Sequence, residues 1–212
     1  MIRTAIFDLG NVLLNVRPER TLNKFMDMIP ERSRYDVTGR LHAGEMKRRY
    51  ESGAMSDREY YEWVKGEFDG DFSFDLFKTI WNDIFEPVPT MIENLSILKD
   101  RLPLVLLSNT NALHIRYCYE QYPWFDWFSE QILSFETGSV KPDPEIYRIA
   151  LGKTNVRPDE CVFLDDLQEN AEAAQHLGIM SCQFLSPGRL ISAADGSEQT
   201  LRTVFNMEDL NI

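Results

Sequence analysis

The hydrophobic positions of this chain fall into short apolar runs that alternate with longer stretches of helical spacing. Runs typical of buried strands cover residues 4–7, 104–107, 131–134, 161–164 and 179–184. Stretches with the spacing of helices cover residues 89–100, 111–121, 144–153 and 168–177. Strands that alternate with helices imply right-handed crossovers and a parallel sheet with helices on both faces. The pattern therefore predicts an α/β fold with a Rossmann-like parallel sheet core.

The segment from about 16 to 85 has a different pattern, which predicts several helices and no strand. Pro18 suits the first turn of a helix. Residues 56–59, with the sequence Ser-Asp-Arg-Glu, form a capping-box pattern. Residues 86–89 contain two prolines and predict a stiff, non-helical connection. We therefore expect a helical cap over residues 16–85 and a core domain made of residues 1–15 and 86–212.

Asp8 directly follows the first apolar run, and Leu9, Gly10 and Asn11 come after it. In open parallel sheets, ligands bind in the crevice at the carboxyl ends of the strands. A helical segment inserted after this strand would lie over that crevice and over Asp8. A carboxylate in such a place is a candidate nucleophile or metal ligand. The alternative for Asp8 alone is a turn residue that ends the strand.

Other strand ends and loops of the predicted sheet carry polar residues in the same region. They are Ser108 and Asn109, then Lys141 in a proline-flanked loop, and then Asp165, Asp166 and Asn170. A carboxylate that attacks a phosphoryl group needs a divalent cation, fixed donors for the phosphoryl oxygens and a nearby positive charge. This combination points to phosphoryl transfer far more specifically than any one of its members.

The arrangement resembles the haloacid dehalogenase-like (HAD) hydrolase superfamily, and the resemblance covers nearly the whole chain. The commonest members are Mg²⁺-dependent phosphatases that work through an aspartyl-phosphate, and many carry a C1-type helical cap. The resemblance implies that Asp8 is the nucleophile and a metal ligand, with the Gly10 backbone carbonyl and Asp166 as further ligands. It implies that the phosphate is bound by Ser108, Asn109 and Lys141, with Asp165 and Asn170 supporting the metal ligands.

The dipeptide Leu113-His114 and four longer segments are similar to those of the bacterial α-D-glucose-1-phosphate phosphatase group. The longer segments are residues 7–12 (FDLGNV), 107–111 (LSNTN), 41–45 (LHAGE) and 50–56 (YESGAMS). The phosphatase domain of soluble epoxide hydrolase is a more distant match. The resemblance therefore implies a Mg²⁺-dependent phosphatase of a small phosphorylated metabolite, such as glucose 1-phosphate or another sugar phosphate.

Gly10 departs from the pattern of most phosphatases in this superfamily. They have an Asp two residues after the nucleophile, where it protonates the leaving group and later activates water. Glycine cannot transfer a proton, and general acid–base help is typically worth about 10²–10⁴ in rate. A water molecule or a residue of the cap could supply the proton. The cap candidates are His42, Glu45, Tyr50 and Glu51.

The sequence leaves two other functions open. One is a metal-free haloacid dehalogenase-type hydrolase that uses Asp8 on carbon, although the acidic pair Asp165-Asp166 argues against it. The other is a weakly active or non-catalytic binding protein with the HAD fold, which Gly10 favours. Chelation of metal ions and turnover of an aryl phosphate would separate these possibilities from a phosphatase.

Composition narrows the range of partners. The 212 residues include 22 basic and 34 acidic side chains, a net charge of −12, which disfavours nucleic acids and anionic membranes. The longest strongly apolar run, residues 102–107, is far too short to span a membrane. Cys118, Cys161 and Cys182 lack the spacing of a metal site and are expected to be buried, reduced thiols of a cytoplasmic protein. The last 25 or so residues show no clear pattern.

Overall fold

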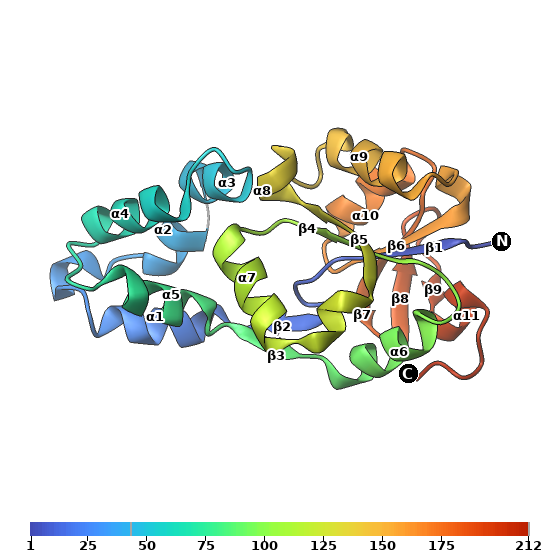
Figure 1. The fold of residues 1–212 in the computed structure, drawn as a ribbon, viewed down its shortest axis with the longest axis horizontal. Coiled ribbons are helices and arrows are strands. Elements are labelled where there is room, and N and C mark those ends of the chain that lie inside the picture. The colour runs from blue at the N-terminus through green and yellow to red at the C-terminus, as the bar shows by residue number, and fades with distance from the viewer. Residues whose placement is uncertain (43, 212) are drawn as a thin grey trace.

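The computed structural model describes residues 1–42 and 44–211, with only the backbone of Thr38 and His42 (Figure 1). A seven-stranded sheet lies at one end of the molecule, and a group of helices lies at the other. The strand order is β5-β4-β1-β6-β7-β8-β9. These strands are β1 (Thr4–Phe7), β4 (Leu104–Ser108), β5 (Phe128–Leu133), β6 (Cys161–Asp165), β7 (Met180–Ser186), β8 (Arg189–Ser192) and β9 (Glu198–Gln199).

Strand β1 lies in the middle of the parallel part of the sheet. It pairs in parallel with β4 on one side and β6 on the other, so that Ile6 is in register with Val105 and Phe163. Strands β5 and β7 continue the parallel order outward, and β8 and β9 add an antiparallel edge. This topology confirms the predicted α/β fold with a parallel core.

Helices cover both faces of the sheet. Successive side chains of a strand point to opposite faces, so each central strand contributes apolar side chains to both layers of helices. Phe7 packs in a cluster with residues of α6 (Pro89–Leu98), α7 (Ala112–Gln121) and α11 (Leu201–Phe205). Ile6 packs in a second cluster with residues of α9 (Pro144–Thr154) and α10 (Gln168–Gln175). A central strand that is buried on both faces therefore appears in the sequence as a continuous apolar run.

Among the described residues, five α-helices lie between β2 (Leu14–Val16) and β3 (Phe85–Pro87) and form the helical insertion. They are α1 (Pro18–Met26), α2 (Val37–His42), α3 (Glu45–Glu51), α4 (Asp57–Glu67) and α5 (Phe74–Asn82). Their hydrophobic cluster includes one residue of α7, Leu113. Tyr60 and Phe77 are fully buried in this cluster. The predicted capping box begins α4, since Glu59 N–H donates to Ser56 Oγ at 3.2 Å and Ser56 N–H donates to Glu59 Oε2 at 2.8 Å.

The prediction that the segment 16–85 contains no strand is wrong at its two ends. Strands β2 (Leu14–Val16) and β3 (Phe85–Pro87) pair antiparallel, with Val16 opposite Phe85. Each strand has three residues, which is too short to give a periodic pattern. This two-stranded ribbon holds together the two chain segments that connect the insertion to the rest of the protein.

The structure also corrects the predicted ends of the chain's later elements. Strand β5 begins at Phe128, and Ser134, which was expected in it, begins the short helix α8 (Ser134–Thr137). The final residues form β8, β9 and α11, which extend the sheet and place Leu201 and Phe205 in its core. Short 3₁₀ helices cover Glu31–Ser33, Pro123–Trp127 and Pro158–Glu160.

Two predictions from composition can be compared with this structure. The three cysteines are buried and form no disulfide, as expected. In the described ranges, no helix has both the length and the apolar character needed to cross a membrane.

Candidate active site

A cavity of about 320 Å³ lies between the carboxyl ends of the central strands and the helical insertion. The strand ends and the loops after them supply Asp8, Gly10, Asn11, Ser108, Asn109, Lys141, Asp166 and Asn170. The insertion supplies Thr21, Lys47, Tyr50, Glu51 and Trp81. The structure therefore brings the site residues expected from the sequence to one place, and the fully buried Asp165 lies directly behind them.

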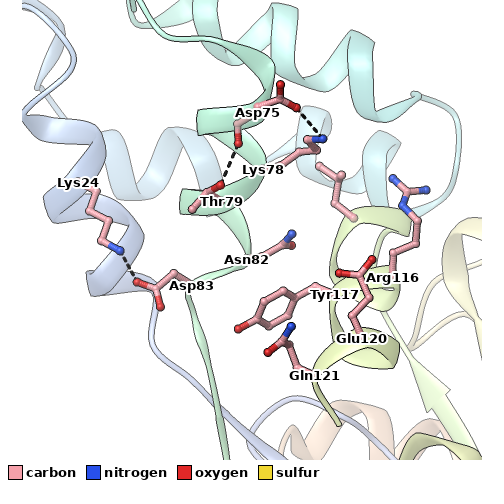
Figure 2. Close-up of a pocket in the computed structure, with 11 residues that line it drawn as sticks. Lys24, Asp75, Lys78, Thr79, Asn82, Asp83, Arg116, Tyr117, Glu120 and Gln121 are labelled. Carbon is pink, nitrogen blue, oxygen red and sulfur yellow. Dashed lines mark hydrogen bonds and ion pairs between the residues drawn. The ribbon is translucent and has the colours of Figure 1, made fainter. Parts of the chain in front are cut away.

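A larger groove of about 700 Å³ lies elsewhere, between α1, α5 and α7 (Figure 2). None of the strand-end residues lines it. Four of its charged side chains form two ion pairs within the groove, because Lys78 Nζ lies 2.8 Å from Asp75 Oδ1 and Lys24 pairs with Asp83. The residues with the chemistry expected from the sequence thus belong to the smaller cavity.

Lys141 lies at the centre of a cluster with Asp8 and Asp165 at the carboxyl ends of β1 and β6. Its Nζ lies 2.7 Å from Asp8 Oδ1, 2.6 Å from Asp165 Oδ2 and 3.0 Å from the Leu107 carbonyl oxygen. Burial alone would lower the pKa of this amine, but the charges of Asp8 and Asp165 outweigh burial and raise the pKa. Lys141 is therefore held as a buried cation against the carboxylate expected to be the nucleophile.

Asp165 uses both carboxylate oxygens within the protein. Its Oδ2 accepts from Lys141, and its Oδ1 accepts at 2.9 Å from both the Leu167 backbone N–H and Asn170 Nδ2. The side chain is fully buried. Asp165 therefore positions Lys141. Because most of its oxygen lone pairs already accept hydrogen bonds, this carboxylate has little capacity left to bind a metal ion.

Asp166 is less buried than its neighbour and lines the cavity. Its Oδ2 accepts from Asn11 Nδ2 at 2.9 Å, and Asn11 Oδ1 accepts from the Val16 backbone N–H at 3.1 Å. Asn11 has a φ of 53°, a left-handed conformation that asparagine tolerates better than most residues. Sequence reasoning missed Asn11 as a partner of Asp166. The signal was an asparagine placed directly after the strand-end glycine.

The carboxylates at the strand ends fit a divalent metal ion. Oxygens of Asp8, Asp165 and Asp166 all lie within 4.8 Å of one another. Oxygen ligands from carboxylates are those preferred by Mg²⁺. Burial, the largest cause, raises the pKa of Asp8 from 3.8 to about 7, with further contributions from the charges of Asp165 and Asp166, while Lys141 opposes the rise. Three close carboxylates beside one lysine therefore carry an excess of negative charge that a cation would neutralise.

The loop after β4 differs in detail from the sequence-based expectation. Ser108 ends the strand and lines the cavity, whereas the helix cap is Asn111, whose Oδ1 accepts from the His114 backbone N–H at 3.1 Å. Asn109 Oδ1 accepts from the Lys141 backbone N–H at 2.7 Å, and its Nδ2 donates to the Lys141 carbonyl at 2.9 Å. The Asn109 side chain thus fixes the loop that carries Lys141.

The four candidates for the missing proton donor lie in different places. Tyr50 and Glu51 line the cavity. Glu45 is exposed at the start of α3 and is not part of the lining. The side chain of His42 lies outside the described residues. His114 also lines the cavity and stacks on Trp81.

Comparison with known proteins gives a family match and relatives that include two phosphatases. A model of the haloacid dehalogenase-like hydrolase family matches residues 2–178. The D-ribitol-5-phosphate phosphatase of Bacteroides thetaiotaomicron is 25% identical over 193 residues, which are 86% of this chain and 92% of that protein. The phosphorylated carbohydrates phosphatase of Thermotoga maritima is 27% identical over 103 residues, 48% of each protein.

A similar solved structure gives the same relationship in three dimensions. It is a HAD-family enzyme from B. thetaiotaomicron in complex with magnesium and inorganic phosphate. It superposes with a TM-score of 0.77 at 25% identity, and the match covers 85% of this chain and 93% of that one. The family match over most of the chain, the shared fold and the cluster at the strand ends agree. The chain belongs to the haloacid dehalogenase-like hydrolase family.

Proposed function

We propose that this protein is a Mg²⁺-dependent phosphatase that hydrolyses a small phosphorylated metabolite, a sugar or polyol phosphate, through an aspartyl-phosphate on Asp8. The observation that carries the proposal is the buried contact of Lys141 with Asp8, in a cavity that Asp166 also lines. Relatives named for phosphatase activity on ribitol 5-phosphate and on phosphorylated carbohydrates support it. Glucose 1-phosphate belongs to the same substrate class.

Asp8, Asp166 and the backbone carbonyl of Gly10 are the groups that would hold Mg²⁺, because Asp165 is committed to Lys141. When bound, the ion offsets the repulsion between the carboxylate and the phosphate and polarises the phosphoryl oxygens. Asn11 keeps Asp166 turned toward this position through its 2.9 Å hydrogen bond. Such supporting hydrogen bonds orient metal ligands.

The chain's own residues then divide the chemical steps between them. Asp8 attacks phosphorus while the bond from phosphorus to the alcohol oxygen breaks. The Ser108 hydroxyl, the backbone N–H of Asn109 and the charge of Lys141 stabilise the oxygens of the transferring group. All three N–H donors of Lys141 are engaged in the structure, so a contact to phosphate replaces one of them. Water then hydrolyses the aspartyl-phosphate, and Asp8 is restored.

The helical insertion serves as the cap that selects the substrate, with residues 16–85 as cap and residues 1–15 and 86–212 as core. Its side of the cavity combines the aromatic Trp81 with the charged Lys47 and Glu51. A cavity of about 320 Å³ suits a small metabolite and is at the low end of the range for ligand pockets. A cap that excludes bulk water would also protect the aspartyl-phosphate from uncontrolled hydrolysis.

The test is phosphate release from a panel of sugar and polyol phosphates that includes ribitol 5-phosphate and glucose 1-phosphate. We expect turnover that requires Mg²⁺, stops with EDTA and is lost in Asp8→Asn, a variant of the same size. Wild-type rates in Asp8→Asn would contradict the mechanism. Hydrolysis of a haloacid that is indifferent to EDTA would instead identify a dehalogenase, and phosphate binding without turnover would identify a binding protein.

A further inference from the structure

The cavity contains a limited set of groups that can exchange a proton. In the part of the chain that the structure describes, its ionisable lining residues are Asp8, Lys47, Tyr50, Glu51, His114, Lys141 and Asp166. Asp8, Lys141 and Asp166 belong to the cluster that binds metal and phosphate. The group that protonates the leaving alcohol therefore has to be sought among the other four, or in a water molecule.

Tyr50 is poorly suited to donate a proton. Its hydroxyl already donates to Asp57 Oδ1 at 2.8 Å. Burial, together with the charge of Asp57, raises the pKa of the phenol, so that it is a weaker acid than an ordinary tyrosine. Its proton is thus both committed and hard to remove.

His114 is also committed to the protein. Its Nδ1 lies 3.0 Å from the Asn111 side-chain nitrogen, and its Nε2 lies 3.2 Å from the Trp81 carbonyl oxygen. This geometry fits a neutral imidazole that accepts at Nδ1 and donates at Nε2. Neither ring nitrogen is then available to a substrate oxygen.

Glu51 differs from both of these residues, and also from Lys47, which is 40% exposed and is engaged in an ion pair with Glu51 itself. Glu51 is the last residue of α3, its side chain is only 17% exposed, and it lines the cavity. Its Oε1 lies 3.4 Å from Lys47 Nζ. Burial raises the pKa of the carboxyl, although Lys47 opposes the rise. Glu51 is the cavity's one described carboxyl group outside the cluster of aspartates, and it is a better proton donor near neutral pH than an exposed glutamate.

Contacts on both sides of Glu51 fix it relative to the sheet. Before it, Tyr50 bonds to Asp57, which pairs in turn with Arg116 on the core helix α7. After it, Gly53 lies against α8, where an added Cβ would be 2.1 Å from the carbonyl oxygen of Phe135. The end of α3 is therefore attached to the core at two places, and these attachments limit how far Glu51 can move relative to the strand ends.

We propose that Glu51 is the general acid and base of this phosphatase and performs the proton transfers that Gly10 cannot. The proposal rests on the phosphatase function proposed above. As the bond from phosphorus to the alcohol oxygen breaks and the bond to Asp8 forms, the Glu51 carboxyl gives its proton to that oxygen. The resulting carboxylate then takes a proton from the water that attacks the aspartyl-phosphate, which releases phosphate and restores the acid.

The test compares Glu51→Gln with Glu45→Gln, which makes the same charge change at an exposed position of the same helix. Both are assayed with Mg²⁺ on phenyl phosphate and on p-nitrophenyl phosphate, because the second leaving group needs little protonation. In Glu51→Gln, kcat/KM should fall by about 10² or more for phenyl phosphate and by less than about tenfold for p-nitrophenyl phosphate. Glu45→Gln should match the wild type on both.

The retained p-nitrophenyl phosphate activity also shows that Glu51→Gln is folded. Equal losses on the two substrates would overturn the assignment of Glu51, because a binding or structural defect does not depend on the leaving group. Unchanged kcat/KM on phenyl phosphate would overturn it as well. A wild-type protein that hydrolyses neither ester with Mg²⁺ would contradict the phosphatase function itself, and the role of Glu51 with it.

Discussion

The strand ends and the helical insertion build the two sides of one cavity in different ways. At the strand ends, Lys141 contacts Asp8, Asp165 and a backbone carbonyl, all within 3.0 Å, and its side chain is 1% exposed. On the insertion side, the ion pair of Glu51 with Lys47 is longer, at 3.4 Å, and Lys47 is 40% exposed. The comparison indicates that the side chains at the strand ends are held in place by short, buried contacts, whereas the pair on the insertion side is longer and more exposed.

Replacing one lysine on each side of the cavity should give the largest difference in stability between the two sides. Lys141→Met leaves Asp8 and Asp165 facing each other without their cation. We expect kcat to fall by about 10²–10³, as for loss of one oxyanion donor, and stability to urea to fall by about 3–5 kcal/mol, as for a broken buried ion pair.

The matched variant on the insertion side is Lys47→Met, which breaks the more exposed pair with Glu51. Its stability cost should stay below about 1 kcal/mol. Urea unfolding in EDTA measures both variants without contributions from bound metal. Equal stability losses would show that the two sides of the cavity are not built differently.

A second prediction distinguishes two roles of Asn11, the orientation of Asp166 by its side chain and the left-handed conformation of its backbone. Asn11→Gly removes the hydrogen bond to Asp166 but tolerates the φ of 53°. Mg²⁺ affinity should fall by about 10–100-fold. Asn155→Gly is the control, because Asn155 has a φ of 52° at the end of α9, away from the cavity. Titration of activity with Mg²⁺ measures both, and equal shifts would exclude a specific role for Asn11.

The third prediction concerns pH and the raised pKa of Asp8, about 7 against its usual value of 3.8. Protons compete with the cation for this carboxylate, so Mg²⁺ affinity should weaken about tenfold per pH unit below 7. Without metal, the folded protein holds this proton above pH 3.8 and the unfolded chain does not. The contribution of Asp8 to stability is therefore present below about pH 4 and lost as pH rises through 7.

Urea unfolding in EDTA between pH 4 and 8 measures this contribution. Asp8→Asn should flatten the profile between about pH 4 and 7, because an amide binds no proton in either the folded or the unfolded state. Asp75→Asn serves as the control, since Asp75 is exposed, remote from the cavity and paired with Lys78 on the surface. An unchanged profile in Asp8→Asn would show that this carboxylate titrates at its usual pH in the metal-free protein.

The smallest effect should come from loosening the attachment of α3 to the core. Gly53→Ala places a Cβ against the Phe135 carbonyl, whereas Gly196→Ala has the same φ of +72° and nothing within 4 Å. Both share the cost of a left-handed alanine, about 1 kcal/mol. Only Gly53→Ala should also lower kcat/KM, by several-fold, because it displaces the neighbouring Glu51. Equal kinetics for the two variants would exclude this attachment as a determinant of activity.

The sequence predicted the parallel core because strands buried on both faces leave continuous apolar runs, as in residues 4–7 and 161–164. It predicted where Asp8, Lys141 and Asp166 meet because the carboxyl ends of such strands share one edge of the sheet. The ribbon of β2 and β3 could not be predicted in the same way, since three-residue strands have no period.

The hydrogen-bond partners of the site residues were harder to predict than their places at the strand ends. Asn109 was expected to bind phosphate, yet its side-chain amide binds the backbone of Lys141 across 32 residues of sequence. Among the candidate acids, Glu45 and Glu51 belong to one short helix, and only the folded insertion places Glu51 in the cavity. Such choices depend on which helix face meets the core, and that face is determined by contacts distant in sequence.

The central claim is that Asp8 becomes phosphorylated during turnover. The most direct measurement is mass spectrometry of the peptide that contains Asp8, after acid quenching of the protein with Mg²⁺ and p-nitrophenyl phosphate. We predict a phosphate on Asp8 in the wild type, a larger fraction in Glu51→Gln because the second step is slowed, and none in Asp8→Asn. Mg²⁺-dependent hydrolysis with no phosphate on Asp8, or with phosphate on another residue, would contradict the account.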